Sequence, residues 1–183
     1  MILASQSPRR RELLSLITTD FKVIPAKGEE ILPEGISPKN AVILLSRQKA
    51  SEIYREYKNE TIIASDTVVA IDGKILGKPV DEADAESMLR LLSGRTHSVF
   101  TGVCIIAPDG SENSFAEETT VEFWALSDEL IADYVKSGEP MDKAGAYGIQ
   151  DSGALLVKSI NGDYYNVMGL PVGRLYRELA DTV

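Results

Sequence analysis

The sequence predicts an α/β fold with a mixed sheet, and three observations lead to this class. Segments with strand character alternate with segments of helical period along the whole chain. The turn signal Asp109-Gly110 separates two long strand-like runs, which favours an antiparallel pair within the sheet. No internal repeat, low-complexity segment or linker interrupts the alternation, so we expect residues 1–183 to form one domain.

The expected strands are rich in β-branched and aromatic residues, or they alternate apolar with polar residues. They lie at residues 2–5, 21–25, 61–70, 74–76, 96–107, 114–124 and 154–160. The expected helices keep helical spacing of apolar residues and begin at Ser, Asp or Pro. They lie at residues 9–16, 38–57, 81 or 84 to 92, 128–136 and 171–180. Residues 28–35 and 140–150 are expected to be irregular because they are rich in Gly, Pro and Ala.

The composition matches an ordinary globular protein, with 44% hydrophobic and 26% charged residues. No apolar run approaches the roughly 20 residues that a membrane span requires. The first residues lack the basic region and cleavage site of a secretory signal, so we expect a cytoplasmic location. The net charge of −9 argues against general attraction to nucleic acid or to an anionic membrane. A phosphate-bearing ligand must therefore meet a local basic cluster.

The single cysteine and the single histidine limit the chemistry further. Cys104 lies in an apolar run and is expected to be a small buried hydrophobic residue. One cysteine excludes a disulfide within the chain, and one histidine cannot complete a zinc site with it. His97 also has no nucleophile motif to act with, so we expect it to be structural.

Three arginines follow Ser7-Pro8 at the start of the first expected helix. Basic residues are unfavourable at a helix N-terminus, where the backbone already carries partial positive charge. A bound anion would relieve this, because the Ser7 hydroxyl, free backbone N–H groups and the guanidinium groups of Arg9 and Arg10 together suit phosphate oxygens. The alternative is a solvated helix start with an ion pair to Glu12. This segment alone leaves both interpretations open.

Asp66 is the second feature, a carboxylate inside an expected buried strand. A buried carboxylate needs a cationic partner or strong hydrogen bonds, or it must take up a proton, and a catalytic acid or base has the same needs. The alternative is an aspartate that closes a turn through its own backbone. Glu30, in the 28–35 loop, could be a solvated charge or could join Asp66 in holding Mg²⁺ or Mn²⁺ with substrate phosphates. Lys49 and Lys78, taken singly, are typical of surface residues.

Seven segments together resemble the Maf family. They are residues 3–14, 47–50, 64–69, 77–79, 92–97, 142–150 and 162–171. The resemblance implies a mixed, strongly curved sheet with flanking helices and two lobes around a cleft, similar to inosine triphosphate pyrophosphatases, and often a homodimer. It also implies hydrolysis of a nucleoside triphosphate to its monophosphate and pyrophosphate.

The resemblance also assigns roles to particular residues. The positions that separate the family's subgroups match Arg10, Thr67 and Gln150, a set that resembles the subgroup acting on dTTP, UTP and modified uridine triphosphates. Asp66 matches the proton acceptor, although a second role as ligand of a divalent cation with Glu30 competes with it. Glu30 or Asp81 could carry either duty instead. The residues expected to bind the phosphates are Ser7, Arg9, Lys49 and Lys78, together with Arg10. The chain departs from the family at Asp151-Ser152, where Gly and a basic residue are common.

Two other functions remain open at this point. The first is a nucleotide-binding regulator of septum formation that does not hydrolyse its ligand, since the family name derives from an effect on cell division. The second is a pyrophosphatase for a noncanonical purine nucleotide, against which only Arg10, Thr67 and Gln150 speak. An enzyme would remove modified nucleotides before their incorporation or take part in arresting division, with a divalent metal cation as cofactor and without a nucleic-acid or membrane partner.

Overall fold

The computed structural model describes residues 1–182, with side chains described through residue 180. Residue 183 of the expected 1–183 unit therefore lies outside the described residues. The strands form one mixed sheet in the order β2-β1-β3-β5-β6-β7, with β4 paired to β3. They are β1 (Ile2–Leu3), β2 (Lys22–Val23), β3 (Ile62–Ile71), β4 (Lys74–Leu76), β5 (Thr96–Ile106), β6 (Glu112–Phe123) and β7 (Val157–Asn161). β1 runs parallel to β2 and β3, and the other pairs are antiparallel, as expected for a mixed sheet.

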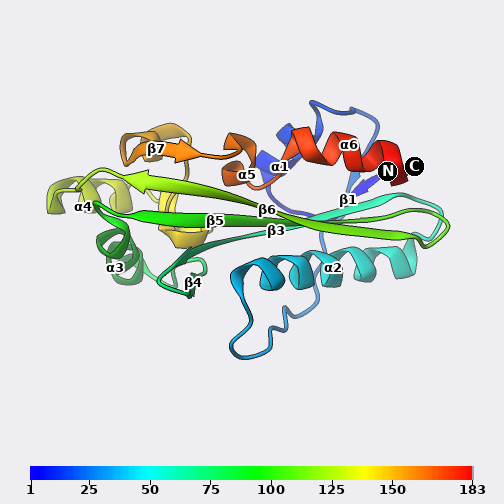
Figure 1. Cartoon of the computed structure of the whole chain (residues 1–183), viewed down its shortest axis with the longest axis horizontal. Helices are drawn as coiled ribbons and strands as arrows, with labels where there is room; N and C mark the ends of the chain where they lie inside the picture. Colours follow the sequence, from blue (N-terminus) through cyan, green and yellow to red (C-terminus); the bar gives the residue numbers. More distant parts are fainter. Residues whose placement is uncertain (183) are drawn as a thin grey trace.

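Helices cover both faces of the sheet (Figure 1). The α-helices are α1 (Pro8–Leu14), α2 (Pro38–Glu56), α3 (Glu82–Leu92), α4 (Asp128–Lys136), α5 (Tyr164–Met168) and α6 (Val172–Thr182). Three short 3₁₀ segments follow α4, namely η1 (Glu139–Asp142), η2 (Ala144–Ala146) and η3 (Asp151–Leu155). α2 lies against one face, α1, α5 and α6 lie on the other, and α3 and α4 pack at the far end of the long strands. No helix within residues 1–182 is long and apolar enough to cross a lipid bilayer.

The alternation of side chains along the central strands sorts the core into layers. Ile62 and Ala64 of β3 pack with Ala50 and Ile53 of α2. Ile63, between them in sequence, packs on the opposite face in a cluster that includes residues of α1 and α6. A third cluster fills the end of the sheet beneath α3 and α4. Cys104 is fully buried in the α2 layer, where burial raises the pKa of its thiol to about 11, so the expectation of a small buried hydrophobic residue is confirmed.

One edge of β3 has a gap that positions the functional site. β1 pairs only with Ile62 and Ile63, and β4 pairs only with residues 69–71. The stretch 64–68 therefore has β5 on one side and no strand partner on the other. Because successive side chains point to opposite faces, Asp66 lies on the α2 face and Thr67 lies on the α5 face of the same gap. Residues from both layers can thus meet around one opening.

Gly102 of β5 brings α2 close to this gap. It pairs directly with Asp66, and a Cβ atom at Gly102 would lie 2.2 Å from the Val42 carbonyl oxygen of α2. The missing side chain lets the helix backbone rest on the sheet. Lys49 follows Val42 by two helical turns and so lies on the same side of α2, directed at Asp66.

The structure shortens four of the expected elements and adds one helix that was not expected. The 2–5 strand is reduced to Ile2–Leu3. The first helix ends at Leu14 instead of residue 16, because the chain there tightens into i→i+3 bonds such as Leu16 N to Leu13 O. The 21–25 strand is reduced to Lys22–Val23. The strand expected at 154–160 begins at Val157, because Gly153 packs against Gly148 and the preceding residues turn as η3. α5 was not expected, although Asp163 caps its start and Gly169 ends it at φ 110°.

Candidate active site

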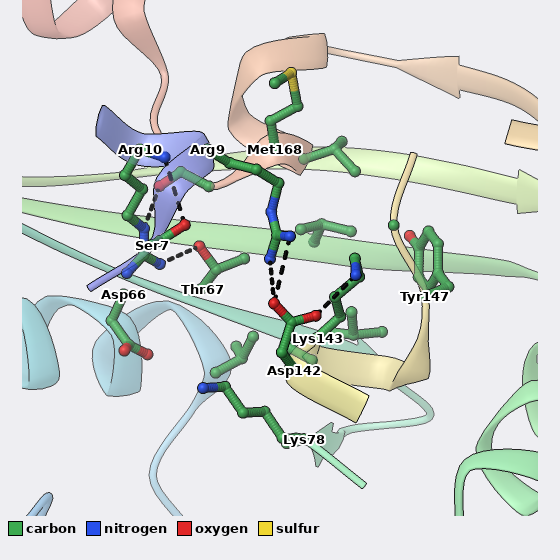
Figure 2. A pocket seen from close by; sticks show the side chains of 18 of the residues that line it. Ser7, Arg9, Arg10, Asp66, Thr67, Lys78, Asp142, Lys143, Tyr147 and Met168 are labelled. Carbon is green, nitrogen blue, oxygen red and sulfur yellow. Dashed lines mark hydrogen bonds and ion pairs between the residues drawn. The ribbon is translucent and has the colours of Figure 1, made fainter. Parts of the chain in front are cut away.

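A cleft of about 450 Å³ opens at the gap in β3 (Figure 2). It is bounded by the N-terminus of α1, by α2, by the loop after β4, by the 3₁₀ segments and by the end of α5. The site residues expected from the sequence all line it: Ser7, Arg9, Arg10, Glu30, Lys49, Asp66, Thr67, Lys78 and Gln150. Asp81 does not; it caps the N-terminus of α3 by accepting a hydrogen bond from the Asp84 amide at 2.8 Å.

A second hollow of about 390 Å³ adjoins the cleft and is lined by most of the same basic side chains. The side chains common to both are Ser7, Arg9, Arg10, Glu30, Lys49, Lys78 and Asp142. The remaining lining of the first cleft is more apolar and includes Tyr147, Ile149, Val167 and Met168. The opening therefore has a charged end that suits phosphates and a less polar end that suits a base.

Arg10 is fixed by three hydrogen bonds at the junction of these two ends. Its Nε donates to the Gly169 carbonyl at 2.9 Å, its Nη2 donates to Thr67 Oγ1 at 2.9 Å, and its Nη1 lies 3.5 Å from Ser5 Oγ. Burial lowers the pKa of Arg10 below its ordinary value of 12.5, and the nearby charge of Asp66 acts in the opposite direction. The guanidinium group remains a fixed cation at neutral pH.

Asp66 and Glu30 converge on one ammonium group. The Asp66 side chain is only 12% exposed, and Lys49 Nζ forms an ion pair with its Oδ1 atom. The same Nζ lies 2.8 Å from Glu30 Oε1. Lys49 thus supplies the cation that a mostly buried carboxylate requires.

Side chains of α2 hold the loop that carries Glu30, both before and after this residue. Glu52 accepts hydrogen bonds from the amides of Lys27 and Gly28 at 2.8 and 2.9 Å. Gln48 bonds both to the Ile31 amide at 3.2 Å and to the Ile31 carbonyl at 2.8 Å. Sequence reasoning missed these two residues, because their spacing on a helix gives no sign that they hold a distant loop.

The family resemblance implies a divalent cation, for which carboxylate oxygens are the usual protein ligands. Among the side chains described, no group of three or more His, Cys, Asp and Glu stands together to hold a metal ion. The side chains through residue 180 therefore form no all-protein cage for a metal ion. Asp66 and Glu30 nevertheless form the pair of oxygen donors that Mg²⁺ uses when substrate phosphates complete its coordination, so the donor set fits a cation shared with a nucleotide.

Asp142 and Lys143 add charges that the sequence analysis did not assign. Figure 2 shows Arg9 and Lys143 directed at the Asp142 carboxylate, at 3.5 and 2.8 Å. Partial burial raises the pKa of Asp142, but the Lys143 hydrogen bond and the charges of Arg9 and Lys78 outweigh it, so the pKa lies below the ordinary 3.8. The only sequence signal for this cluster was its place in the 142–150 segment.

The strand-like loop that carries Gln150 is anchored by two tyrosines. Tyr134 Oη accepts a hydrogen bond from the Gly148 amide at 3.1 Å, and Tyr147 Oη lies 2.7 Å from His97 Nε2. Asp151 follows with φ 51°, a left-handed conformation that Asp tolerates better than most side chains. The same conformation suits the glycine that the family resemblance implies at this position. The Ser152 hydroxyl donates a hydrogen bond to Glu139 Oε1 at 2.7 Å, which ties this end of the loop to η1.

His97 has a structural role, as expected from the sequence. It is 3% exposed, does not line the cleft, and packs between Phe123 and Tyr147. Burial lowers the pKa of His97 from 6.5 to about 4.

We expect this shift to make stability depend on pH. Between pH 6.5 and pH 4 the unfolded chain binds a proton at His97 that the folded chain does not, so the free energy of unfolding falls as the pH falls through this window. The loss should total about 3 kcal/mol. Urea unfolding at several pH values would measure it. His97→Gln should flatten the profile above pH 5, and an unchanged profile in that variant would contradict the assignment.

The fold and the cleft together define an α/β protein that can bind a compact polyanion beside a paired carboxylate. The family described as Maf-like protein matches residues 1–182, and the chain belongs to this family. A relative named dTTP/UTP pyrophosphatase from Bacillus mycoides (strain KBAB4) is 50% identical over 179 residues, which cover 98% of this chain and 93% of the relative. A relative with the same name from Carboxydothermus hydrogenoformans is 53% identical over 180 residues, which cover 98% and 96%.

A solved structure supports the fold independently. A HAM1 protein from Coxiella burnetii superposes with a TM-score of 0.54 at 17% sequence identity, and the match covers 98% of both chains. At this identity the likeness concerns the fold alone. It agrees with the mixed, curved sheet with flanking helices that the sequence predicted.

Proposed function

We propose that this chain hydrolyses dTTP and UTP to the nucleoside monophosphate and pyrophosphate. The observation that carries the proposal is the position of Asp66, a shielded carboxylate paired with Lys49 inside a cleft that is also lined by Arg9, Arg10, Lys78 and Lys143. The names of relatives that are about half identical over nearly the whole chain support the same reaction and substrates. A cleft of about 450 Å³ is also within the usual range for small-molecule sites.

The charged end of the cleft would hold the triphosphate. Arg9 offers a planar fork to the phosphate oxygens, and Lys49 and Lys78 add compact charges. The Arg9 guanidinium lies 3.5 Å from Asp142, a long contact between partly exposed groups that phosphate can replace at little cost. This local cluster compensates for the acidic balance of the chain as a whole.

Asp66 would accept the proton from the attacking water. The water oxygen bonds to the α-phosphorus, the bond from that phosphorus to the α,β-bridging oxygen breaks, and pyrophosphate leaves with the electron pair. Mg²⁺ or Mn²⁺, when bound with the nucleotide by Asp66 and Glu30, supplies charge neutralisation for the phosphate oxygens. Lys49 forms an ion pair with Asp66 and so holds this carboxylate in place, and Arg9 stabilises the charge that develops on the leaving group.

Gln150, at the less polar end, would contact the base. A Gln150→Glu substitution keeps the shape of the side chain but replaces an N–H donor with an acceptor and adds a charge. We expect kcat/KM for dTTP and UTP to fall about 100-fold, while a guanine nucleotide, whose N–H groups suit a carboxylate, loses much less. Steady-state rates with dTTP, UTP and GTP measure the effect. An unchanged preference for dTTP over GTP would remove Gln150 from the specificity set.

The function is tested by pyrophosphate release from dTTP, UTP, 5-methyl-UTP, GTP, ITP and 7-methyl-GTP, each with Mg²⁺ and with Mn²⁺. We expect metal-dependent release from the first three and little from the purines. Release chiefly from ITP or GTP would favour the purine alternative. Tight binding of dTTP without release from any nucleotide would favour the regulator of septum formation.

A further inference from the structure

We propose that Thr101, a buried threonine outside the cleft lining, fixes the Thr67 hydroxyl as a hydrogen-bond acceptor toward the nucleotide, so that Thr67 reads the N3–H group of uracil or thymine. The inference rests on the proposed function, because it concerns which group of the base meets Thr67. Thr101 is a positioning residue in this account, since it acts only through Thr67.

The direction of each hydrogen bond follows from the donors available. Thr101 Oγ1 lies 2.8 Å from the backbone carbonyl of Asn166 and 2.9 Å from Thr67 Oγ1. A carbonyl can only accept, so the single hydroxyl hydrogen of Thr101 is committed to Asn166. Between the two threonines Thr67 must therefore donate. Its own hydrogen points into the protein, away from the cleft.

Arg10 uses one of the two acceptor positions of the Thr67 hydroxyl. Arg10 Nη2 donates to Thr67 Oγ1 at 2.9 Å, which occupies one of the two lone pairs (Figure 2). One lone pair remains, and Thr67 is half-buried in the cleft lining. Among its contacts in the described structure, Thr67 thus has one acceptor site left for a ligand and no donor.

The neighbouring atoms offer the complementary group. Arg10 has five N–H hydrogens, and its contacts with Gly169, Thr67 and Ser5 use three of them. The two that remain are one on each terminal nitrogen, and Nη2 is the nitrogen that already contacts Thr67. An acceptor next to a donor matches the N3–H and adjacent carbonyl of uracil and thymine.

The surroundings prevent Thr101 from turning. Its side chain is fully buried between β3 and α5, and it lies directly opposite Thr67 in the β3–β5 register. Asn166, which is also fully buried, is held in turn by Val99 O at 3.1 Å and Thr119 Oγ1 at 3.0 Å. The buried hydrogen-bond network behind the cleft therefore decides that the Thr67 hydroxyl donates inward and accepts from the cleft.

The experiment compares UTP with 3-methyl-UTP, which carries a methyl group in place of the N3 hydrogen. kcat and KM are measured for the wild type, Thr101→Ser and Thr101→Val. We expect the wild type and Thr101→Ser to prefer UTP by about tenfold or more in kcat/KM. In Thr101→Val the Thr67 hydroxyl loses its inward acceptor and can turn its hydrogen into the cleft, so the preference should fall several-fold, mainly through a higher KM for UTP.

The possible results separate this inference from the proposed function. Equal losses on both nucleotides in Thr101→Val, with an unchanged ratio, would mean that Thr101 only supports the fold and would overturn the inference. So would a wild type that uses both nucleotides equally. If Thr101→Val does not fold, Thr67→Val serves instead and should lower turnover of UTP more than that of 3-methyl-UTP; equal losses would again overturn it. A wild type that hydrolyses neither UTP nor dTTP would remove the proposed function itself.

Discussion

Asp66→Asn is expected to lower kcat for dTTP and UTP by about 10³-fold, because an amide cannot accept the proton of the attacking water at neutral pH. The fold should survive. Asn has nearly the same shape as Asp, and Lys49 retains Glu30 at 2.8 Å, so its ammonium group is not left buried without a partner. The loss should appear in kcat more than in KM, since the cations that bind the phosphates remain.

The matched control for this change is Asp72→Asn. Asp72 closes the β3–β4 turn at φ 51°, a conformation that Asn adopts readily, and it pairs with Arg95 outside the cleft. Turnover of this variant should stay within about twofold of the wild type, because an exposed ion pair contributes little to stability. Turnover of Asp66→Asn within tenfold of the wild type would end the assignment of Asp66 as proton acceptor.

Gly102→Ala is expected to have the largest effect on stability. The added Cβ would lie 2.2 Å from the Val42 carbonyl oxygen, and the backbone of α2 cannot move aside as a flexible side chain would. The helix must shift, at a cost of about 3 kcal/mol or more. For a chain of this size that corresponds to a drop in melting temperature of roughly 6–12 °C. Turnover should fall as well, since α2 carries Lys49.

Gly173→Ala controls for the change of residue type. Gly173 lies in α6, and a Cβ there would meet nothing closer than Arg177 Nη1 at 4.0 Å. Alanine should therefore stabilise the helix by up to about 1 kcal/mol. Thermal unfolding of both variants measures the contrast. A Gly102→Ala protein as stable as the wild type would show that α2 does not rest on the sheet at this residue.

The residue pattern predicted the long helices and strands well. Where it placed an element wrongly, short-range contacts of the backbone explain the difference. The β3 strand and α2 were predicted to within a residue or two, because a long apolar run and a long helical period leave little freedom. The 154–160 strand was placed too early, because the apolar residues Ala154 and Leu155 suggested a strand. Leu155 is in fact exposed, since packing of Gly153 on Gly148 turns the chain first.

The site was predictable where a residue conflicts with its local surroundings. Arginines at a helix start and an aspartate in an apolar strand both require a partner, and the structure brings those side chains into one cleft. Thr101, Gln48 and Glu52 conflict with nothing in the sequence. Their contacts join residues 17 to 65 positions apart, and they become visible only when the gap in β3, the path of α2 and the placement of α5 are known.

Hydrolysis of UTP in ¹⁸O-labelled water tests the central claim most directly, because it reports which bond is broken and which phosphorus is attacked. Attack at the α-phosphorus in this cleft predicts one labelled oxygen in UMP, unlabelled pyrophosphate, and product formation about 10³-fold slower with Asp66→Asn. Label in pyrophosphate, or release of UDP and inorganic phosphate, would contradict the account of how Asp66 and the surrounding cations act.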